Sequence, residues 1–110
     1  MHEIAVVYVT CPDSGVAATL ARTLVAERLA ACGNILPGVR SIYAWQGELQ
    51  DEPEVLLLLK TRRSRVDDLC ARVAALHPYQ VPEAIAAPIV AGLPAYLSWV
   101  ADGVDQGDAP

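Results

Sequence analysis

The chain has 110 residues, of which 54% are apolar and 19% are charged, and eight basic against thirteen acidic side chains give it a net charge of −5. This length and apolar content are typical of a single domain with one continuous core, and the negative balance argues against binding to nucleic acid or an anionic membrane, because both need a positive field. No apolar run is long enough to span a bilayer, and the first residues lack the basic region of a signal peptide, so we expect a cytoplasmic protein.

A strand followed by a long helix is predicted for the first third of the chain. Residues 4–10 form a nearly continuous apolar run rich in β-branched side chains, which is typical of a strand covered on both faces. Residues 12–15, Pro-Asp-Ser-Gly, then offer a turn and a helix N-cap. From Val16 apolar residues recur at helical spacing until Gly33-Asn34 ends the pattern, so we expect an amphipathic helix of about five turns.

Two further strands are expected to pair as a long hairpin. Residues 34–45 are apolar around a Pro37-Gly38 pair, which predicts a strand that is bent or bulged near its start. Residues 46–51 are polar and predict the turn, and residues 54–61 form a second buried strand. Because one short polar segment separates the two strands, we expect them to be direct neighbours in a sheet.

A second helix follows the hairpin. Ser64, with Asp67 three positions further on, resembles a capping box at a helix start. Apolar residues at helical spacing then predict a helix over residues 66–76, and His77-Pro78 ends it because the residue before a proline avoids helical geometry.

The last part of the chain carries weaker signals. Residues 81–90 predict a strand at a sheet edge, since two prolines in this segment cannot donate to a ladder. A short helix is expected from residue 93 or 94 to about residue 100 or 104. Residues 102–110 are polar and acidic, so we expect one domain over residues 1–101 and a frayed tail over 102–110.

The predicted order of elements is β-α-β-β-α-β with a terminal helix, an α+β fold of the ferredoxin-like split β-α-β kind. Such a sheet is antiparallel and has both long helices on one face. Residues 4–10 and 55–59 are nevertheless apolar at successive positions, so both faces of these strands require burial. We therefore expect the second face to pack against another copy of the same chain.

Three cysteines, Cys11, Cys32 and Cys70, are odd in number and lie in apolar segments, which favours reduced thiols over a disulfide framework. Cys11 follows a strand and precedes a helix, where the helix dipole can lower the pKa of a thiol and make it a metal ligand or nucleophile. No histidine lies nearby in sequence to act as its base, and the alternative is a small apolar residue of the core.

Six short blocks are spread over nearly the whole chain. They are Thr10-Cys11-Pro12-Asp13, Leu29-Ala30-Ala31-Cys32, Ile42-Tyr43-Ala44-Trp45-Gln46-Gly47, Leu59-Lys60-Thr61, His77-Pro78-Tyr79-Gln80-Val81-Pro82-Glu83 and Tyr96-Leu97-Ser98-Trp99. In this order they resemble the hallmark blocks of the CutA divalent-cation tolerance family. The block that starts at His77, taken together with the one that contains Trp45, is far more specific than any single short motif.

This resemblance implies a ferredoxin-like protomer assembled as a tight homotrimer, with the sheets facing inward and the hairpin reaching across to a neighbour. It implies a role in tolerance of copper and other divalent cations, through binding and not catalysis. An alternative is a PII-like trimer or a scaffold that takes a small molecule or a partner protein in clefts between subunits. An acylphosphatase would share the fold plan but needs a Gly-rich anion loop with a partnering arginine, and no such loop follows the first strand.

His77 is the leading candidate for a metal ligand, because neutral imidazole binds copper and zinc. The resemblance implies that some bacterial relatives hold copper with a strand cysteine and two adjacent histidines, but Val9 and Leu76 stand at two of those positions here. The alternative is that His77 caps the helix end or bonds a neighbouring carbonyl. We expect no required cofactor; copper or zinc is the cation that could bind, with Cys11 as a further candidate ligand.

Other residues of these blocks are expected near clefts between subunits. A carboxylate, an ammonium group and phenols in such a cleft could hold a small anion or a hydrated cation, or they could form a structural ion pair with aromatic packing. The cleft candidates are Tyr43, Lys60, Tyr79 and Glu83. Large rigid aromatic residues dominate subunit contacts, so we expect Trp45 and Trp99 to anchor the trimer interface.

Overall fold

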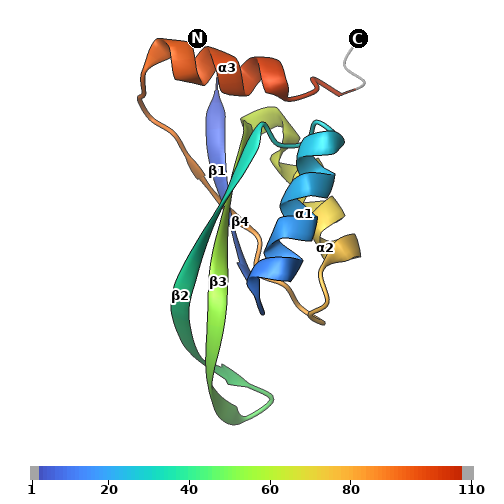
Figure 1. Cartoon of the computed structure of the whole chain (residues 1–110), viewed down its shortest axis with the longest axis vertical. Coiled ribbons are helices and arrows are strands. Elements are labelled where there is room, and N and C mark those ends of the chain that lie inside the picture. The colour runs from blue at the N-terminus through green and yellow to red at the C-terminus, as the bar shows by residue number, and fades with distance from the viewer. Residues whose placement is uncertain (1–2, 108–110) are drawn as a thin grey trace.

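The computed structural model describes residues 3–107, which contain one four-stranded sheet and three α-helices (Figure 1). In chain order the elements are β1 (Ile4–Cys11), α1 (Ser14–Ala26), β2 (Cys32–Trp45), β3 (Glu48–Arg62), a 3₁₀ turn (Arg63–Arg65), α2 (Val66–Leu76), β4 (Ile85–Pro88) and α3 (Pro94–Gly103). This order confirms the predicted succession of four strands and two long helices with a terminal helix.

The sheet has the strand order β2-β3-β1-β4, and every pair of neighbours is antiparallel. Figure 1 shows α1 and α2 on the same side of it. The main core lies between these helices and the side chains of β1 and β3 that face them; it includes Val7, Val9, Leu57, Leu59, Leu20, Leu24, Leu69 and Val73. The predicted α+β class is confirmed, since helices cover one face of an antiparallel sheet.

α1 begins where the sequence predicts but ends much earlier. The Asp13 carboxylate caps its first turn through a hydrogen bond of 2.8 Å from a backbone N–H. The helix ends at Ala26, and Arg28 adopts a φ of 60°, a left-handed value that no helix interior accommodates. The prediction of a helix up to residue 33 is wrong because the apolar pattern continues through Leu29-Ala30, which is buried in an irregular connection.

β2 and β3 form the predicted hairpin, and it is longer than the pattern of polar residues indicates. The pairing continues out to Trp45, which lies opposite Glu48. Only Gln46-Gly47 makes the turn, with φ values of 50° and 80° that suit a tight two-residue hairpin loop. The turn expected over residues 46–51 is wrong beyond residue 47, because backbone pairing with β2 holds the following polar residues in β3.

The predicted bend in β2 is confirmed. The register between β2 and β3 shifts between Leu36 and Val39, so Pro37-Gly38 forms a bulge. Beyond this bulge Arg40 and Asp51 form two hydrogen bonds of 2.8 and 2.6 Å across the hairpin. The outer half of the hairpin therefore has a cross-strand ion pair of its own.

Two details after β3 differ from the predictions. Ser64 lies within the 3₁₀ turn, and α2 starts at Val66 after Arg65 with no side-chain cap, so the predicted capping box is wrong. The chain enters α2 through this tighter turn instead. β4 occupies only four residues of the predicted 81–90, because its pairing with β1 is limited to Ala5–Tyr8.

α3 extends past the expected domain boundary at residue 101. It continues to Gly103, and Val104 is 2% exposed. The Asp105 N–H then donates to the Arg28 carbonyl over 2.8 Å, so this part of the expected tail is packed on the domain. Residues 108–110 of that tail lie outside the described residues. Among residues 3–107 no helix combines the length and the apolarity needed to cross a membrane.

The face of the sheet opposite α1 and α2 is covered only in part. α3 packs on one end of it, where Ile4 contacts Val100 and Ala101. Further along this face Leu36 is 41% exposed and Ile85 is 60% exposed. A surface with large exposed apolar side chains of this kind is typical of a contact region.

Candidate functional site

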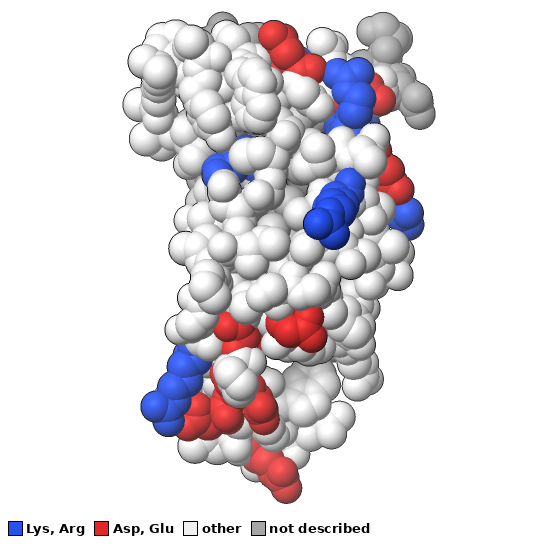
Figure 2. Space-filling view, viewed as in Figure 1, with Lys and Arg blue, Asp and Glu red and all other residues white. Residues whose placement is uncertain are grey.

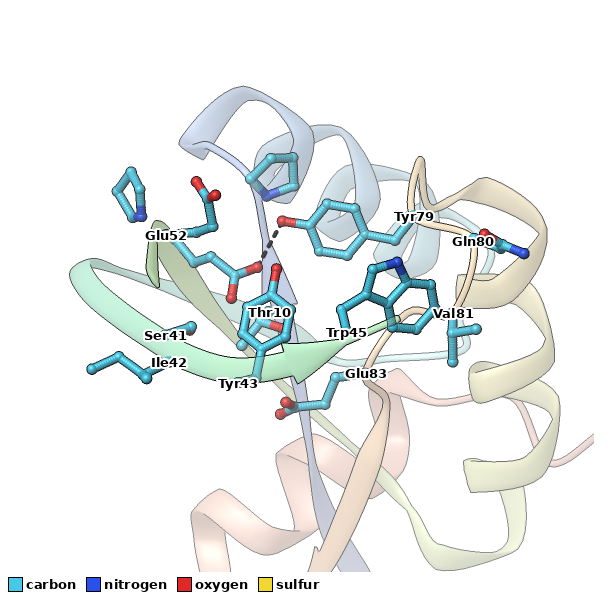
Figure 3. Close-up of a pocket in the computed structure, with 13 residues that line it drawn as sticks. Thr10, Ser41, Ile42, Tyr43, Trp45, Glu52, Tyr79, Gln80, Val81 and Glu83 are labelled. Atoms are coloured by element: carbon cyan, nitrogen blue, oxygen red, sulfur yellow. Dashed lines mark hydrogen bonds between the residues drawn. The ribbon is translucent and has the colours of Figure 1, made fainter. Parts of the chain in front are cut away.

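A cleft of about 830 Å³ lies between the β2–β3 hairpin, the end of β1 and the segment that follows α2 (Figure 3). Its aromatic and acidic lining residues are Tyr43, Trp45, Tyr79, Glu52, Glu54 and Glu83. No lysine or arginine of the described chain lines it. Figure 2 shows the same bias more widely, since carboxylates gather toward the hairpin end of this view and most basic side chains lie further up. The cleft is therefore acidic as well as aromatic.

Tyr79 and Glu54 form the polar contact at the back of the cleft. The Tyr79 hydroxyl donates to Glu54 Oε2 over 2.7 Å, and Glu54 is only 7% exposed. Burial, the hydrogen bond to this carboxylate and its charge together raise the pKa of the Tyr79 phenol. The phenol consequently stays protonated at neutral pH and remains a hydrogen-bond donor.

His77 lies behind this pair, and both of its ring nitrogens have hydrogen-bond partners. Nε2 lies 2.8 Å from the Thr10 carbonyl oxygen, which can only accept, so Nε2 carries the proton. Nδ1 accepts the Tyr79 N–H over 3.1 Å. The ring is 7% exposed and packs at a tilt against the Tyr79 ring. This geometry is that of the structural alternative, in which His77 ends α2 and bonds a neighbouring carbonyl.

Cys11 is the last residue of β1, and its side chain is fully buried in the main core. Burial raises the pKa of its thiol to about 11, and the charges of Glu54 and Asp13 act in the same direction. Of the two alternatives for Cys11, this geometry is that of a small apolar residue of the core. Across residues 3–107 no group of three or more His, Cys, Asp and Glu side chains is placed to hold a metal ion.

The structure brings three of the four predicted cleft residues together. Tyr43, Tyr79 and Glu83 all line the cleft. Lys60 does not: its ammonium group donates to the Asn34 side chain, on a part of the hairpin remote from the turn. None of the ion pairs described within one chain includes Lys60, and the prediction of a cleft between subunits stays a prediction.

The two tryptophans lie on different elements. Trp45 is at the outer end of β2, lines the cleft and is 39% exposed. Trp99 is on α3, stacks on Tyr96 with ring centroids 5.7 Å apart and is 54% exposed. In Figure 1 the hairpin turn and α3 lie at opposite ends of the molecule. A single interface that contains both tryptophans would have to extend along the full length of the molecule, or the two tryptophans would have to contact different copies of the chain.

The sequence did not single out Glu54 or Glu52 as site residues. Glu54 is one of several acidic residues that precede an apolar run, and none of them stands out in the sequence as a site residue. Its pairing with Tyr79 depends on how far β3 extends toward the hairpin turn, and the polar residues before it concealed that length.

Comparison with known proteins places this fold and sequence in one family. The family model described as CutA1 divalent ion tolerance protein matches residues 5–103. The divalent-cation tolerance protein CutA of Thermus thermophilus is 54% identical over 95 residues, which are 86% of this chain and 92% of that protein. A CutA homolog of Xenopus laevis is 48% identical over 104 residues, which are 94% of this chain and 69% of that protein.

Solved structures agree with these sequence matches. The crystal structure of CutA1 from Oryza sativa superposes with a TM-score of 0.92 at 43% identity, covering 96% of this chain and 97% of that one. The Thermus thermophilus protein superposes with a TM-score of 0.89 at 50% identity, covering 93% and 99%. The family description and those of the Thermus thermophilus protein name tolerance of divalent cations. With its sequence matched from residue 5 to residue 103 and its fold reproduced, the chain belongs to the CutA1 divalent ion tolerance family.

Proposed function

We propose that this chain is the ferredoxin-like protomer of a homotrimer that acts in the cytoplasm in tolerance of divalent cations, copper or zinc among them, by binding and not by catalysis. The observation that carries this proposal is the family match over residues 5–103. The Thermus thermophilus protein, which is described as a divalent-cation tolerance protein, is 54% identical to this chain over 95 residues. The strand order β2-β3-β1-β4, with α1 and α2 as crossovers, supports the ferredoxin-like assignment.

The uncovered sheet face supports the trimer. Leu36 is partly exposed and Ile85 is largely exposed in one chain, and β2 is a long strand with a free edge within the described sheet. Burying such side chains gains about 25 cal/mol for each Å² of apolar surface removed from water. A second and third copy of the chain would supply the missing cover and would also shield the edge of β2 from aggregation.

The residues at the predicted copper positions do not fit a resident metal site in one chain. His77 has no free nitrogen lone pair, because Nδ1 accepts the Tyr79 N–H and Nε2 is protonated. The Cys11 thiol is buried and resists ionisation, whereas metal coordination requires a thiolate. We therefore propose that cations bind the assembled protein without His77 or Cys11 as ligands.

Two measurements test this function. Light scattering should give the mass of three chains; the mass of one chain would overturn the trimer. Ile85→Glu should dissociate the trimer, while Val25→Glu, the same kind of change at a partly exposed position on α1, should leave it intact.

Calorimetric titration with copper and zinc should show saturable binding to the trimer, and the His77→Ala variant should bind these cations equally well. If neither cation binds, the proposed function fails; if His77→Ala abolishes binding, the exclusion of His77 fails.

A second candidate function is the binding of a small molecule in the cleft. The observation that favours it is the cleft volume of about 830 Å³, within the range of about 300–1,000 Å³ typical of small-molecule sites. A screen of metabolites for ligands that raise the thermal stability of the trimer tests it.

A further inference from the structure

We propose that the cleft between the β2–β3 hairpin and the segment after α2 binds an organic cation, an amine that carries an apolar or aromatic group. This inference depends on the cleft alone and stands apart from divalent-cation tolerance. It specifies the ligand class of the second candidate function.

The chemistry of the lining favours a positive ligand. Every charged side chain that lines the cleft in the described chain is a carboxylate, and none of the ion pairs there includes Glu52, Glu54 or Glu83. Glu54 is more than nine-tenths buried, and its one described hydrogen bond comes from a neutral phenol, so no basic group among residues 3–107 pairs with its charge. A buried carboxylate of this kind gains most from a cation nearby.

The aromatic rings favour an organic cation over an anion or a neutral ligand. Figure 3 shows Tyr43, Trp45 and Tyr79 around the same space, with Glu83 and Glu52 toward its margin. Aromatic faces attract ammonium groups through their quadrupole, and sites for such ligands combine several rings. The same rings provide apolar contact for the rest of the molecule.

Size and ligand geometry argue against a bare metal ion in this space. The cleft holds about 830 Å³, far more than one ion and its ligands occupy. Within residues 3–107 no three carboxylate, thiol or imidazole groups converge as a coordination shell would require. An amine with an apolar body uses both the volume and the separated carboxylates.

Three ligands of similar shape distinguish recognition of the ligand's charge from recognition of its aromatic ring. Benzylamine, benzyl alcohol and benzoate share a ring and differ in being positive, neutral and negative at neutral pH. Trp45 reports binding once Trp99→Phe has left it as the one tryptophan of the chain. Benzylamine should change the Trp45 fluorescence saturably and bind about tenfold more tightly than benzyl alcohol, and benzoate should show no saturable change.

Substitutions in the same Trp99→Phe background locate the site. Glu54→Gln should weaken benzylamine binding about tenfold, and Asp102→Asn, which removes an exposed carboxylate on α3, should leave it unchanged. Because Glu54→Gln can impair folding, Glu83→Gln at an exposed position provides a second variant, expected to weaken binding severalfold with native thermal stability.

Four outcomes would overturn the proposal. Equal binding of benzyl alcohol would show that the cleft selects only the ring, and tighter binding of benzoate would make it an anion site. The absence of a saturable response would exclude a ligand of this class. If Trp45 is also protected from quenching by acrylamide, a second copy of the chain fills the cleft. Unchanged benzylamine binding in Glu83→Gln and in a folded Glu54→Gln would place the amine elsewhere. None of these results bears on the mass or the copper and zinc titrations.

Discussion

The Tyr79 hydroxyl donates to Glu54 Oε2 over 2.7 Å and so joins the segment after α2 to the β2–β3 hairpin. Because Glu54 is almost fully buried, this donor compensates part of the desolvation of its carboxylate. Tyr79 also contacts His77 through its backbone N–H and its ring. Tyr79 thus links its own segment directly to β3, and His77, which it contacts, links the same segment to the end of β1 through the Thr10 carbonyl.

Tyr79→Phe should lower the free energy of unfolding by about 1–3 kcal/mol, since it leaves a buried carboxylate without its donor. Urea unfolding at fixed protein concentration measures the change. Tyr43→Phe is the matched control: this hydroxyl lines the same cleft on a 41% exposed side chain, so its removal should cost little. Equal effects of the two variants would contradict the role assigned to the Tyr79–Glu54 bond.

His77→Ala should destabilise the chain by about 2–3 kcal/mol, because it removes the ring's bonds to the Thr10 carbonyl and the Tyr79 N–H and leaves a cavity. Leu76→Ala changes the neighbouring residue, which is 38% exposed, and should cost much less. Chemical denaturation of both variants tests this; a small effect of His77→Ala would mean that the ring is not structural.

Stability should fall at alkaline pH. Burial raises the pKa of the Cys11 thiol from an ordinary value of 9.0 to about 11 in the folded chain. As pH rises through this interval the unfolded chain loses a proton that the folded chain keeps, so the folded state loses up to about 2–3 kcal/mol. The raised pKa of Tyr79 acts in the same direction at higher pH.

Thermal unfolding measured from neutral pH to about pH 11 checks this expectation. Cys11→Ala should flatten the alkaline decline. Val9→Ala, a change at another fully buried position of β1 that has no titratable group, should lower stability by a similar amount at every pH. Parallel curves for wild type and Cys11→Ala would refute the assigned cause.

Gly33→Ala should destabilise the fold by about 1–3 kcal/mol through overpacking. A Cβ at this position of β2 would lie 3.0 Å from the Ala21 Cβ on α1 and 3.2 Å from a methyl of Leu57, both of which are held in place by the core. Gly92→Ala would meet only the flexible end of Leu97 at 3.2 Å and should be tolerated. Comparable melting temperatures for the two variants would argue against tight packing of α1 on β2.

The parts of the fold that could be predicted are those set by local patterns. The apolar run around Val7 and the helical spacing after Val66 each define an element on their own. The end of α1 could not be predicted, because Leu29 keeps the apolar spacing although the backbone has already left the helix. The length of the hairpin was concealed because residues 48–53 pair through their backbone and not through apolar side chains.

The candidate site required distances along strands that a motif does not give. Tyr79 and Glu54 are 25 residues apart and meet only once α2 returns the chain to the hairpin. Lys60 belongs to a shared block but lies six residues from Glu54 on β3, a separation of about 20 Å along an extended strand. The shared sequence blocks therefore indicated which residues are candidates for a site, and only the fold showed which of them lie close together.

The bulge at Pro37-Gly38 separates the outer part of the hairpin from the part that is paired within the sheet. The hairpin is anchored to the sheet on one side of the bulge, and its free arm carries Tyr43 and Trp45 as one wall of the cleft. From Val39 to Trp45 this arm measures about 20 Å, so a rotation of about 5° at its root displaces the tip by about 2 Å. A change in the bend at this bulge, whose two residues do not line the cleft, would therefore change the width of the cleft opening.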